Sequence, residues 1–69
     1  MEIKWQDDFR IKVSVDKDTA VVSADRGGLL SLAAQLAALA EETPGSHIHY
    51  DSGNSLEEGS AGLIIEKTE

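Results

Sequence analysis

Alternating apolar and polar positions mark the first third of the chain. The odd-numbered residues between positions 3 and 15 are apolar, except at Asp7. A repeat of two is that of a β-strand with one buried face, so this stretch predicts two strands separated near Asp7 and Asp8. Residues 16–18 are a polar turn, and residues 19–23, with three β-branched side chains among five, predict a third strand.

The pattern then changes to that of a helix. Ser23 or Asp25 can cap a helix whose body runs from about Arg26 to Glu42, and the Thr43-Pro44-Gly45 turn ends it. Consecutive glycines at 27 and 28 weaken the first turn, so we expect a frayed or tight start. The apolar residues that share one helix face predict the side packed on a sheet: Leu29, Leu32, Ala33, Leu36, Leu39 and Ala40.

Two further strands follow the helix, at His47–Asp51 and Leu63–Lys67. The loop between them, residues 52–61, is polar and rich in glycine, and Leu56 is its one large apolar residue, which we expect to anchor it to the core. The order strand, strand, strand, helix, strand, strand predicts a two-layer α+β fold. One helix would pack on a single, mostly antiparallel sheet of about five strands, all in one domain over residues 1–69.

Length and composition restrict the class of protein. A chain of 69 residues has room for one small core, and without cysteine it has neither disulfides nor a thiolate zinc site to support that core. The apolar stretch from Leu29 to Ala40 is too short to span a bilayer, and no basic and apolar leader precedes the first strand. We therefore expect a soluble, cytoplasmic protein with no membrane partner.

Charge is unevenly distributed along the chain. The net charge is −7, and residues 27–69 carry only Lys67 against seven acidic residues. Affinity for nucleic acid requires Lys and Arg to displace counterions from phosphates, so the sequence argues against a nucleic-acid partner. A basic protein partner is the natural complement. The acidity would also serve to keep a small protein soluble, and composition does not separate these two roles.

His47, His49 and Asp51 resemble a metal or catalytic constellation. At alternate strand positions they would share one face, but such positions lie about 7 Å apart, too far for all three to converge on one ion. The serines nearby lack a nucleophile-elbow pattern, and Gly27-Gly28 lacks the spacing of a phosphate loop. We expect no enzyme, no cofactor and no resident metal. A small metal-binding or regulatory domain using His47 and His49 stays as an alternative.

Two surfaces are candidates for binding a protein. The helix carries no charge between Gly27 and Ala40, so its outer side predicts self-association, with a homodimer as one form, through Leu30, Ala34, Ala37 and Ala38. The alternative is that alanine there simply favours helix. If Ile48 and Tyr50 face the helix, the histidines lie on the open face of the sheet. They would then share it with the outward residues of the second strand, Arg10, Lys12 and Ser14, if Ile11, Val13 and Val15 point inward.

Four short blocks occur in order along the rest of the chain: Gly28-Leu29-Leu30-Ser31-Leu32-Ala33, His47-Ile48-His49-Tyr50-Asp51, Ser55-Leu56-Glu57-Glu58-Gly59-Ser60 and Leu63-Ile64-Ile65-Glu66. Together they resemble the immunity protein 32 family of bacterial polymorphic-toxin systems, over about residues 23–66. Residues 1–22 match only as generic strands. Asp25-Arg26-Gly27 departs from the polar and acidic lead that this family would place before the Gly-Leu-Leu block.

The resemblance implies a small, non-enzymatic α+β protein of the cytoplasm that binds and neutralises a co-encoded toxin domain. Carried over by motif, the partner-binding positions are His47, His49, Asp51, Ser55, Glu57 and Glu58. The acidity of the second half of the chain suits a basic toxin such as a nuclease, although that step comes from charge and not from the resemblance.

Overall fold

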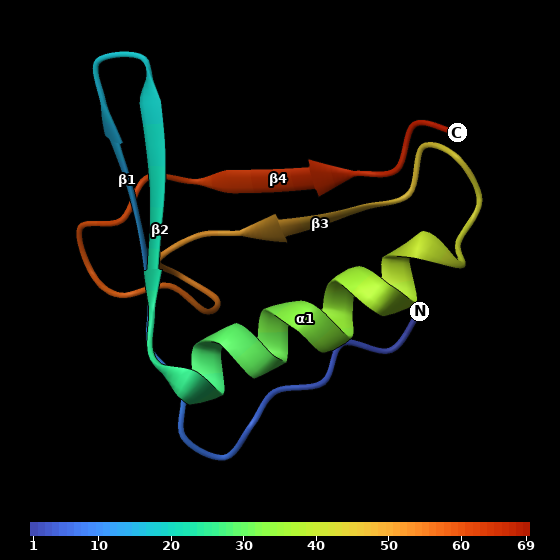
Figure 1. Cartoon of the computed structure of the whole chain (residues 1–69), viewed down its shortest axis with the longest axis horizontal. Coiled ribbons are helices and arrows are strands. Elements are labelled where there is room, and N and C mark those ends of the chain that lie inside the picture. Colours follow the sequence, from blue (N-terminus) through green and yellow to red (C-terminus); the bar gives the residue numbers. More distant parts are fainter.

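The computed structural model describes all 69 residues and contains one helix and four strands (Figure 1). In chain order these are β1 (Ile11–Asp16), β2 (Thr19–Ala24), α1 (Arg26–Ala40), β3 (His47–Tyr50) and β4 (Leu63–Glu66). The predicted α+β class is confirmed. The single five-stranded sheet is wrong, because β1 pairs only with β2 and β3 only with β4, in two separate antiparallel sheets.

The β1–β2 hairpin closes through a two-residue loop, Lys17-Asp18, between the paired residues Asp16 and Thr19. Lys17 takes a positive φ of 57°, which a tight hairpin turn requires at its first loop position. Ile11 and Val13 are buried as the alternation predicts, but Val15 is 62% exposed. The expectation for Val15 is wrong because the far half of the hairpin extends beyond the body of the molecule (Figure 1).

The start of α1 is tight, and the close approach of another segment explains its two glycines. A Cβ atom at Gly27 would overlap the carbonyl oxygen of Asp8, and one at Gly28 would lie 2.5 Å from the carbonyl oxygen of Arg10. Asp25 is the N-cap, and its Oδ1 accepts hydrogen bonds from the amides of Gly28 (2.8 Å) and Arg10 (3.0 Å). The helix start is thereby fixed against the chain that enters β1.

The two hydrogen bonds to Asp25 also lower the pKa of its carboxyl below the ordinary value of 3.8. The carboxylate therefore stabilises the fold at neutral pH. This contribution is lost as the pH falls below about 3.8 and through the lowered pKa of the folded state.

The buried face of α1 differs from the predicted leucine face. Its fully buried residues include Ser31 and Gln35, each 1% exposed, whereas Leu29 and Leu36 are exposed. Leu39 is buried and Leu32 is half-buried, so the helix is turned by roughly one residue, about 100°, from the predicted orientation.

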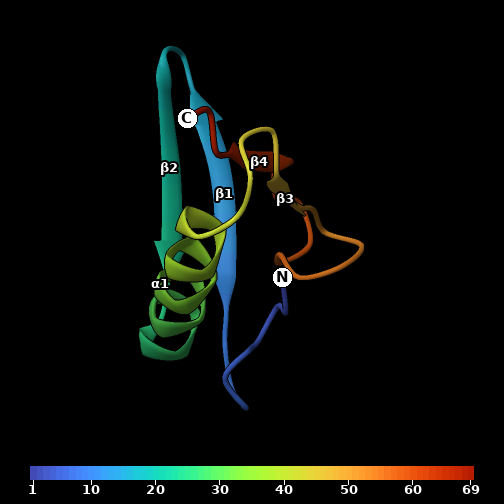
Figure 2. The same ribbon diagram turned by 90° about the vertical axis from the view of Figure 1, so that its right-hand side faces the viewer.

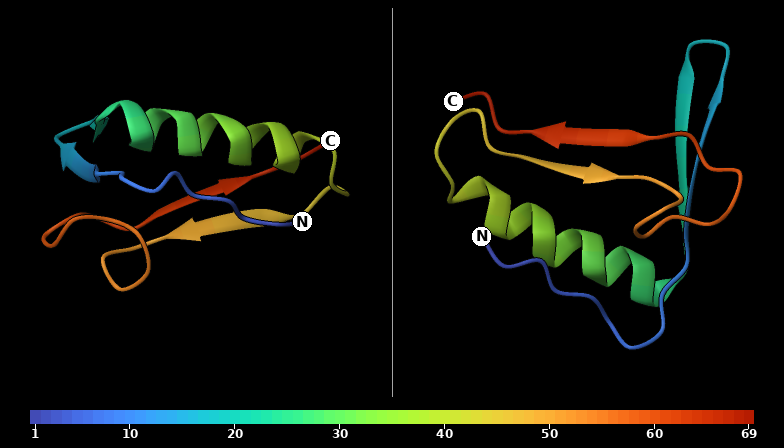
Figure 3. Two further views of the ribbon diagram at one scale, coloured as in Figure 1. Left: turned by 90° about the horizontal axis from the view of Figure 1, so that it is seen from below. Right: turned by 180° about the vertical axis from the view of Figure 1, so that it is seen from behind.

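Polar residues face inward because residues 1–10 lie against that side of the helix (Figure 3). Gln6 N donates to Ser31 Oγ (2.9 Å), and Gln35 Nε2 donates to the carbonyl oxygen of Lys4 (2.9 Å). The first predicted strand, within residues 3–9, is absent, because its backbone bonds to helix side chains instead of to a neighbouring strand. Tyr50 Oη completes the arrangement by donating to Gln35 Oε1 (2.6 Å).

The core lies between α1, the start of β1 and the inner side of β3. Its buried members are Ile11, Val13, Leu39, Ile48, Tyr50 and Leu56. Trp5 stacks on Phe9 with ring centroids 4.5 Å apart and meets the ring of Tyr50 edge-on at 6.2 Å, which brings the N-terminal segment into the core. Leu56 is 5% exposed, so the prediction that it anchors the long loop is confirmed.

The end of α1 is capped by a side chain from the C-terminal strand region. Lys67 Nζ donates to the carbonyl oxygens of Ala40 and Glu42, each at 2.7 Å. A cation at this end complements the helix dipole and satisfies carbonyls that have no partner within the helix. Pro44 and Gly45 then turn the chain into β3, and Gly45 adopts a φ of 95° that favours glycine.

The two hairpins cross in space. Figure 1 shows β1 and β2 running across the direction of β3 and β4, and Figure 2 shows α1 beside the lower end of β2, away from β3 and β4. The helix is not of the length and apolar character that crossing a membrane requires. These placements leave most of β2 and one face of β3–β4 at the surface.

We predict that Gly27→Ala destabilises the protein by about 2 kcal/mol or more, because the new methyl group must displace the backbone at Asp8. Alanine at an unobstructed helix position would instead stabilise by up to about 1 kcal/mol, so the sign is diagnostic. Urea unfolding measures it. The control is Gly62→Ala, where the nearest atom lies 3.9 Å away and the change should be small.

We predict that Tyr50→Phe costs about 1–3 kcal/mol, because it leaves the buried Gln35 Oε1 without a donor. Gln35→Leu likewise leaves the buried Tyr50 hydroxyl without its hydrogen-bond acceptor. The double variant should therefore cost less than the sum of the two singles in a double-mutant cycle. Strict additivity would contradict this coupling.

The alkaline limb of the stability curve provides a second measurement on the same pair. Burial raises the pKa of Tyr50 above its ordinary 10.0. The neutral phenol therefore stabilises the fold below that pH, and the contribution is lost as the pH rises beyond it. Tyr50→Phe should flatten this alkaline dependence.

Candidate functional site

The β3–β4 sheet has one buried face and one exposed face. Ile48 and Tyr50 are buried, as predicted. His47 and His49 are exposed, and their cross-strand partners are Glu66 and Ile64. Ile64 is 59% exposed, so the outer face combines a large apolar side chain with two histidines and an acid.

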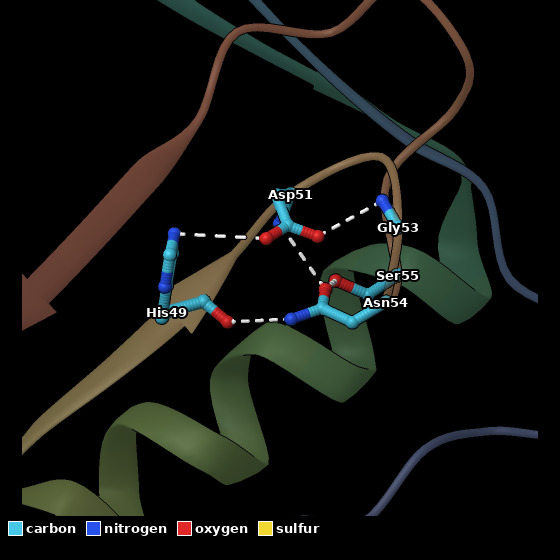
Figure 4. Close-up of polar contacts among 5 residues, drawn as sticks. All are labelled: His49, Asp51, Gly53, Asn54 and Ser55. Atoms are coloured by element: carbon cyan, nitrogen blue, oxygen red, sulfur yellow. Dashed lines mark hydrogen bonds and ion pairs between the residues drawn. The ribbon is translucent and has the colours of Figure 1, made fainter.

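A compact turn follows β3 and holds the next candidate residues (Figure 4). The carbonyl oxygen of Asp51 accepts hydrogen bonds from the amides of Asn54 (3.2 Å), Ser55 (3.0 Å) and Leu56 (2.9 Å). Asp51 Oδ1 also accepts from Gly53 N at 2.9 Å. Aspartate and asparagine commonly stabilise turns through such local bonds, so the carboxylate has a structural role here.

Asn54 joins this turn back to β3. Its Nδ2 donates to the carbonyl oxygen of His49 (3.0 Å), and its Oδ1 accepts from Asp51 N (3.1 Å) and from Ser55 Oγ. Sequence analysis did not single out Asn54. The Asp-x-x-Asn spacing of a turn was the signal available for it.

The interaction between His49 and Asp51 is weak. His49 Nε2 lies 3.7 Å from Asp51 Oδ2, and the two side chains are 56% and 44% exposed. Exposed pairs of this kind contribute roughly 0–1 kcal/mol. His47 Nδ1 lies 3.4 Å from the carbonyl oxygen of Gly45, in the turn that precedes β3. Both imidazoles are therefore available to a partner.

The side chains on this face are not arranged as the ligands of one metal ion. No group of three His, Asp or Glu side chains is positioned to hold one ion. His47 and His49 are successive residues of one strand face, with Asp51 two residues further, so the three groups follow a line and do not surround a point. A structural zinc site needs four converging ligands.

A hollow of about 300 Å³ lies along the edge of β3, between that strand and the N-terminal segment. It is lined by Met1, Ile3, Trp5, His47, Ile48, His49, Tyr50 and Asn54. This hollow was not predicted, because the alternation over residues 3–9 indicates a strand. The hollow places the two histidines beside an apolar groove.

Glu57 and Glu58, the acidic residues predicted in the long loop, lie beside β1 and not on the β3–β4 sheet. Glu57 and Glu58 are exposed, and Glu57 N donates to the carbonyl oxygen of Ile11 at 2.8 Å, so this part of the loop follows β1. Glu57 borders a second hollow of about 420 Å³ together with Arg10 and Lys12. The expected platform of histidines beside Arg10, Lys12 and Ser14 on one sheet is wrong, because β1 and β3 belong to different sheets.

The four residues predicted for self-association differ in their exposure to solvent. Leu30, Ala34 and Ala37 are exposed, whereas Ala38 is half-buried. Ala34 and Ala38 line a hollow of about 470 Å³ that also contains Met1 and Glu2. The N-terminal segment therefore borders that side of the helix, and the freely exposed apolar stripe runs instead through Leu29 and Leu36.

The chain is thus a small α+β domain with an exposed sheet face of mixed polar and apolar residues and a hydrogen-bonded turn after β3. The chain belongs to the immunity protein 32 family, whose model matches residues 19–68. The match covers β2, α1, β3, the long loop and β4, and it confirms the resemblance inferred from the four sequence blocks. No curated protein and no solved structure matches the chain.

We predict that Asn54→Ala loosens the turn after β3 at a cost of about 1 kcal/mol, because it removes the bonds to His49 O and Asp51 N. Amide hydrogen exchange should accelerate at Ser55 and Leu56 while the β1–β2 hairpin stays protected. Ser52→Ala is the matched control, since the Ser52 side chain makes no hydrogen bond. Equal exchange in both variants would show that Asn54 does not organise the turn.

Proposed function

We propose that this protein neutralises a co-encoded toxin domain by binding it and covering a functional surface of the toxin, without catalysis of its own. The observation that carries the proposal is membership of the immunity protein 32 family over residues 19–68. Because the chain lacks cysteine and needs no oxidising compartment for its fold, we place this action in the cytoplasm.

The exposed face of β3–β4 is the first part of the proposed binding surface. Ile64 lies opposite His49 and is largely exposed; the neighbouring pair on this face is His47 and Glu66, and Asp51 follows β3 directly. An apolar side chain surrounded by polar groups resembles the centre and rim of a protein interface. His47, His49 and Asp51 are the sequence-predicted residues in this part.

The loop after β3 forms the second part. Its backbone is fixed at Asp51 and Asn54 and again where Glu57 N bonds to β1, while the side chains of Glu57 and Glu58 point into solvent. Ser55 is half-buried and bonded within the turn, so it shapes the loop more than it presents a contact. A loop that is already ordered loses little conformational entropy when it binds.

Charge supports a basic toxin as the partner. The net charge of −7 comes almost entirely from residues 27–69, and Lys67, the one cation there, is bonded to the end of α1. Opposite fields accelerate encounter and make association sensitive to salt. A nuclease is one class of toxin with the required basic surface.

We predict that Glu57→Lys/Glu58→Lys weakens binding to the toxin encoded beside this gene by at least about tenfold, equivalent to 1.4 kcal/mol. The reason is that the reversal replaces two fixed acids that meet the basic surface. Ile64→Ser should weaken binding with less dependence on salt. Titration calorimetry measures the affinities, and survival of toxin-expressing cells measures protection.

Asp7→Lys/Asp18→Lys is the matched control, because it makes the same change in net charge at exposed sites in the N-terminal segment and the β1–β2 loop, outside β3, β4 and the loop between them. An equal loss of toxin affinity in the control variant would show that net charge alone causes the effect, and it would contradict a localised binding site. A neighbouring toxin whose activity is unaffected by the wild-type protein would contradict the function itself.

A further inference from the structure

The backbone of β2 leaves one complete strand edge open. The hairpin loop is two residues long, so Asp16 and Thr19 form a hydrogen-bonded pair and such pairs recur at every second residue. The N–H and C=O groups of Ala20 and Val22 therefore point away from β1. None of the backbone hydrogen bonds outside the helix and the strand ladders involves Ala20 or Val22.

The opposite edge of the same hairpin confirms this alternation and is covered at Ile11 and Val13. Ile11 O accepts from Glu57 N, and Val13 O accepts from Ala61 N, each at 2.8 Å. Val13 N donates to Ser60 Oγ at 3.2 Å. The loop thus bonds to outward groups of Ile11 and Val13 in β1, whereas no hydrogen bond within the chain reaches those of Ala20 and Val22 in β2.

The other edges carry features that discourage pairing. His49 O on the edge of β3 is bonded to Asn54, and the N-terminal segment lies alongside. The edge of β4 is only four residues long and ends in Glu66. By contrast β2 has six residues, all neutral, with no proline and no bulge, and short or charged edges are the usual protection against strand pairing.

We propose that a second copy of this chain pairs with this edge, so that two β2 strands run antiparallel and form a four-stranded sheet, β1–β2–β2′–β1′. The proposal goes beyond toxin binding and uses a different surface. Isolated two-stranded hairpins are marginally stable, and the far half of this one is exposed on both faces from Val15 to Val22.

The outward backbone groups restrict the register. Hydrogen-bonded pairs across the two-fold axis must join residues whose groups point outward, and we take the register that joins residues 20 and 22, which brings Ala20 opposite Val22′ and Val21 opposite its own copy. The same register sets Thr19 opposite Ser23′ and Lys17 opposite Asp25′. Asp25 is still extended, with φ −81° and ψ −175°, so the strand direction persists to that residue. No pair brings like charges together.

The outer side of α1 adds a second argument for a copy as the occupant. Figure 2 shows α1 on the same side of the molecule as β2, away from β3 and β4. Between Gly27 and Ala40 the helix is uncharged, and its exposed side chains include Leu29, at 56% exposed, and Leu36, at 41%. Because these strand and helix surfaces carry no charge, two copies of this acidic chain can meet through them without bringing their carboxylates face to face.

Cysteine substitution tests the register directly, because the chain contains no cysteine. Under mild oxidation Val21→Cys should form a disulfide-linked dimer several-fold faster than Val22→Cys, and far faster than the control Val15→Cys, which is more exposed but lies off the edge. Fastest crosslinking at Val22→Cys, or equal rates at all three positions, would overturn the proposal.

Sedimentation of the wild-type protein should show a monomer–dimer equilibrium, and Val21→Lys should shift it to monomer by placing two cations face to face. Because Val21 is exposed, far-UV circular dichroism should stay unchanged in the variant. A wild type that stays monomeric at several hundred micromolar overturns the proposal. If Val21→Lys weakens toxin affinity in that monomer, the edge belongs to the toxin and not to a copy.

Discussion

The carboxamide of Gln35 joins three parts of the chain at one buried point. It accepts from the Tyr50 hydroxyl at 2.6 Å and donates to the Lys4 carbonyl at 2.9 Å. This fixes α1 against β3 on one side and against the N-terminal segment on the other. Since an amide is costly to bury without partners, the helix cannot rotate to bury its leucines without breaking both bonds. The orientation of α1, and with it the exposed stripe, follows from this constraint.

The same interaction explains which parts of the fold could be predicted. Strand and helix ranges after residue 10 follow from local pattern, and the alternation at Ile48 and Tyr50 correctly gave the faces of β3. The helix face was wrong because counting leucines cannot detect that Ser31 and Gln35 have partners in a distant segment. Residues 3–9 have the alternation of a strand, but side chains of α1 satisfy part of their backbone, so no ladder forms.

Polar side chains elsewhere also hold the backbone. Asp25 fixes the start of α1 and Lys67 its end, while Asp51 and Asn54 fold the loop after β3. The apparent catalytic pattern of His47, His49 and Asp51 therefore separates into two roles. The aspartate shapes the turn, and the histidines stay at the surface. Sequence spacing could group these residues, but it could not show that Glu57 and Glu58 lie near β1, because that placement depends on the path of the long loop.

Because the strands form two small sheets, the protein has more strand edges than the predicted single sheet would have. A single five-stranded sheet would have two edges, whereas two separate hairpins have four. The long loop covers part of the β1 edge, residues 1–10 cover part of the β3 edge, and the β4 edge is short and ends in an acid. Only β2 keeps both its length and its neutrality. In the proposed dimer a second copy covers this edge, which as an open, uncharged edge would favour unspecific strand pairing.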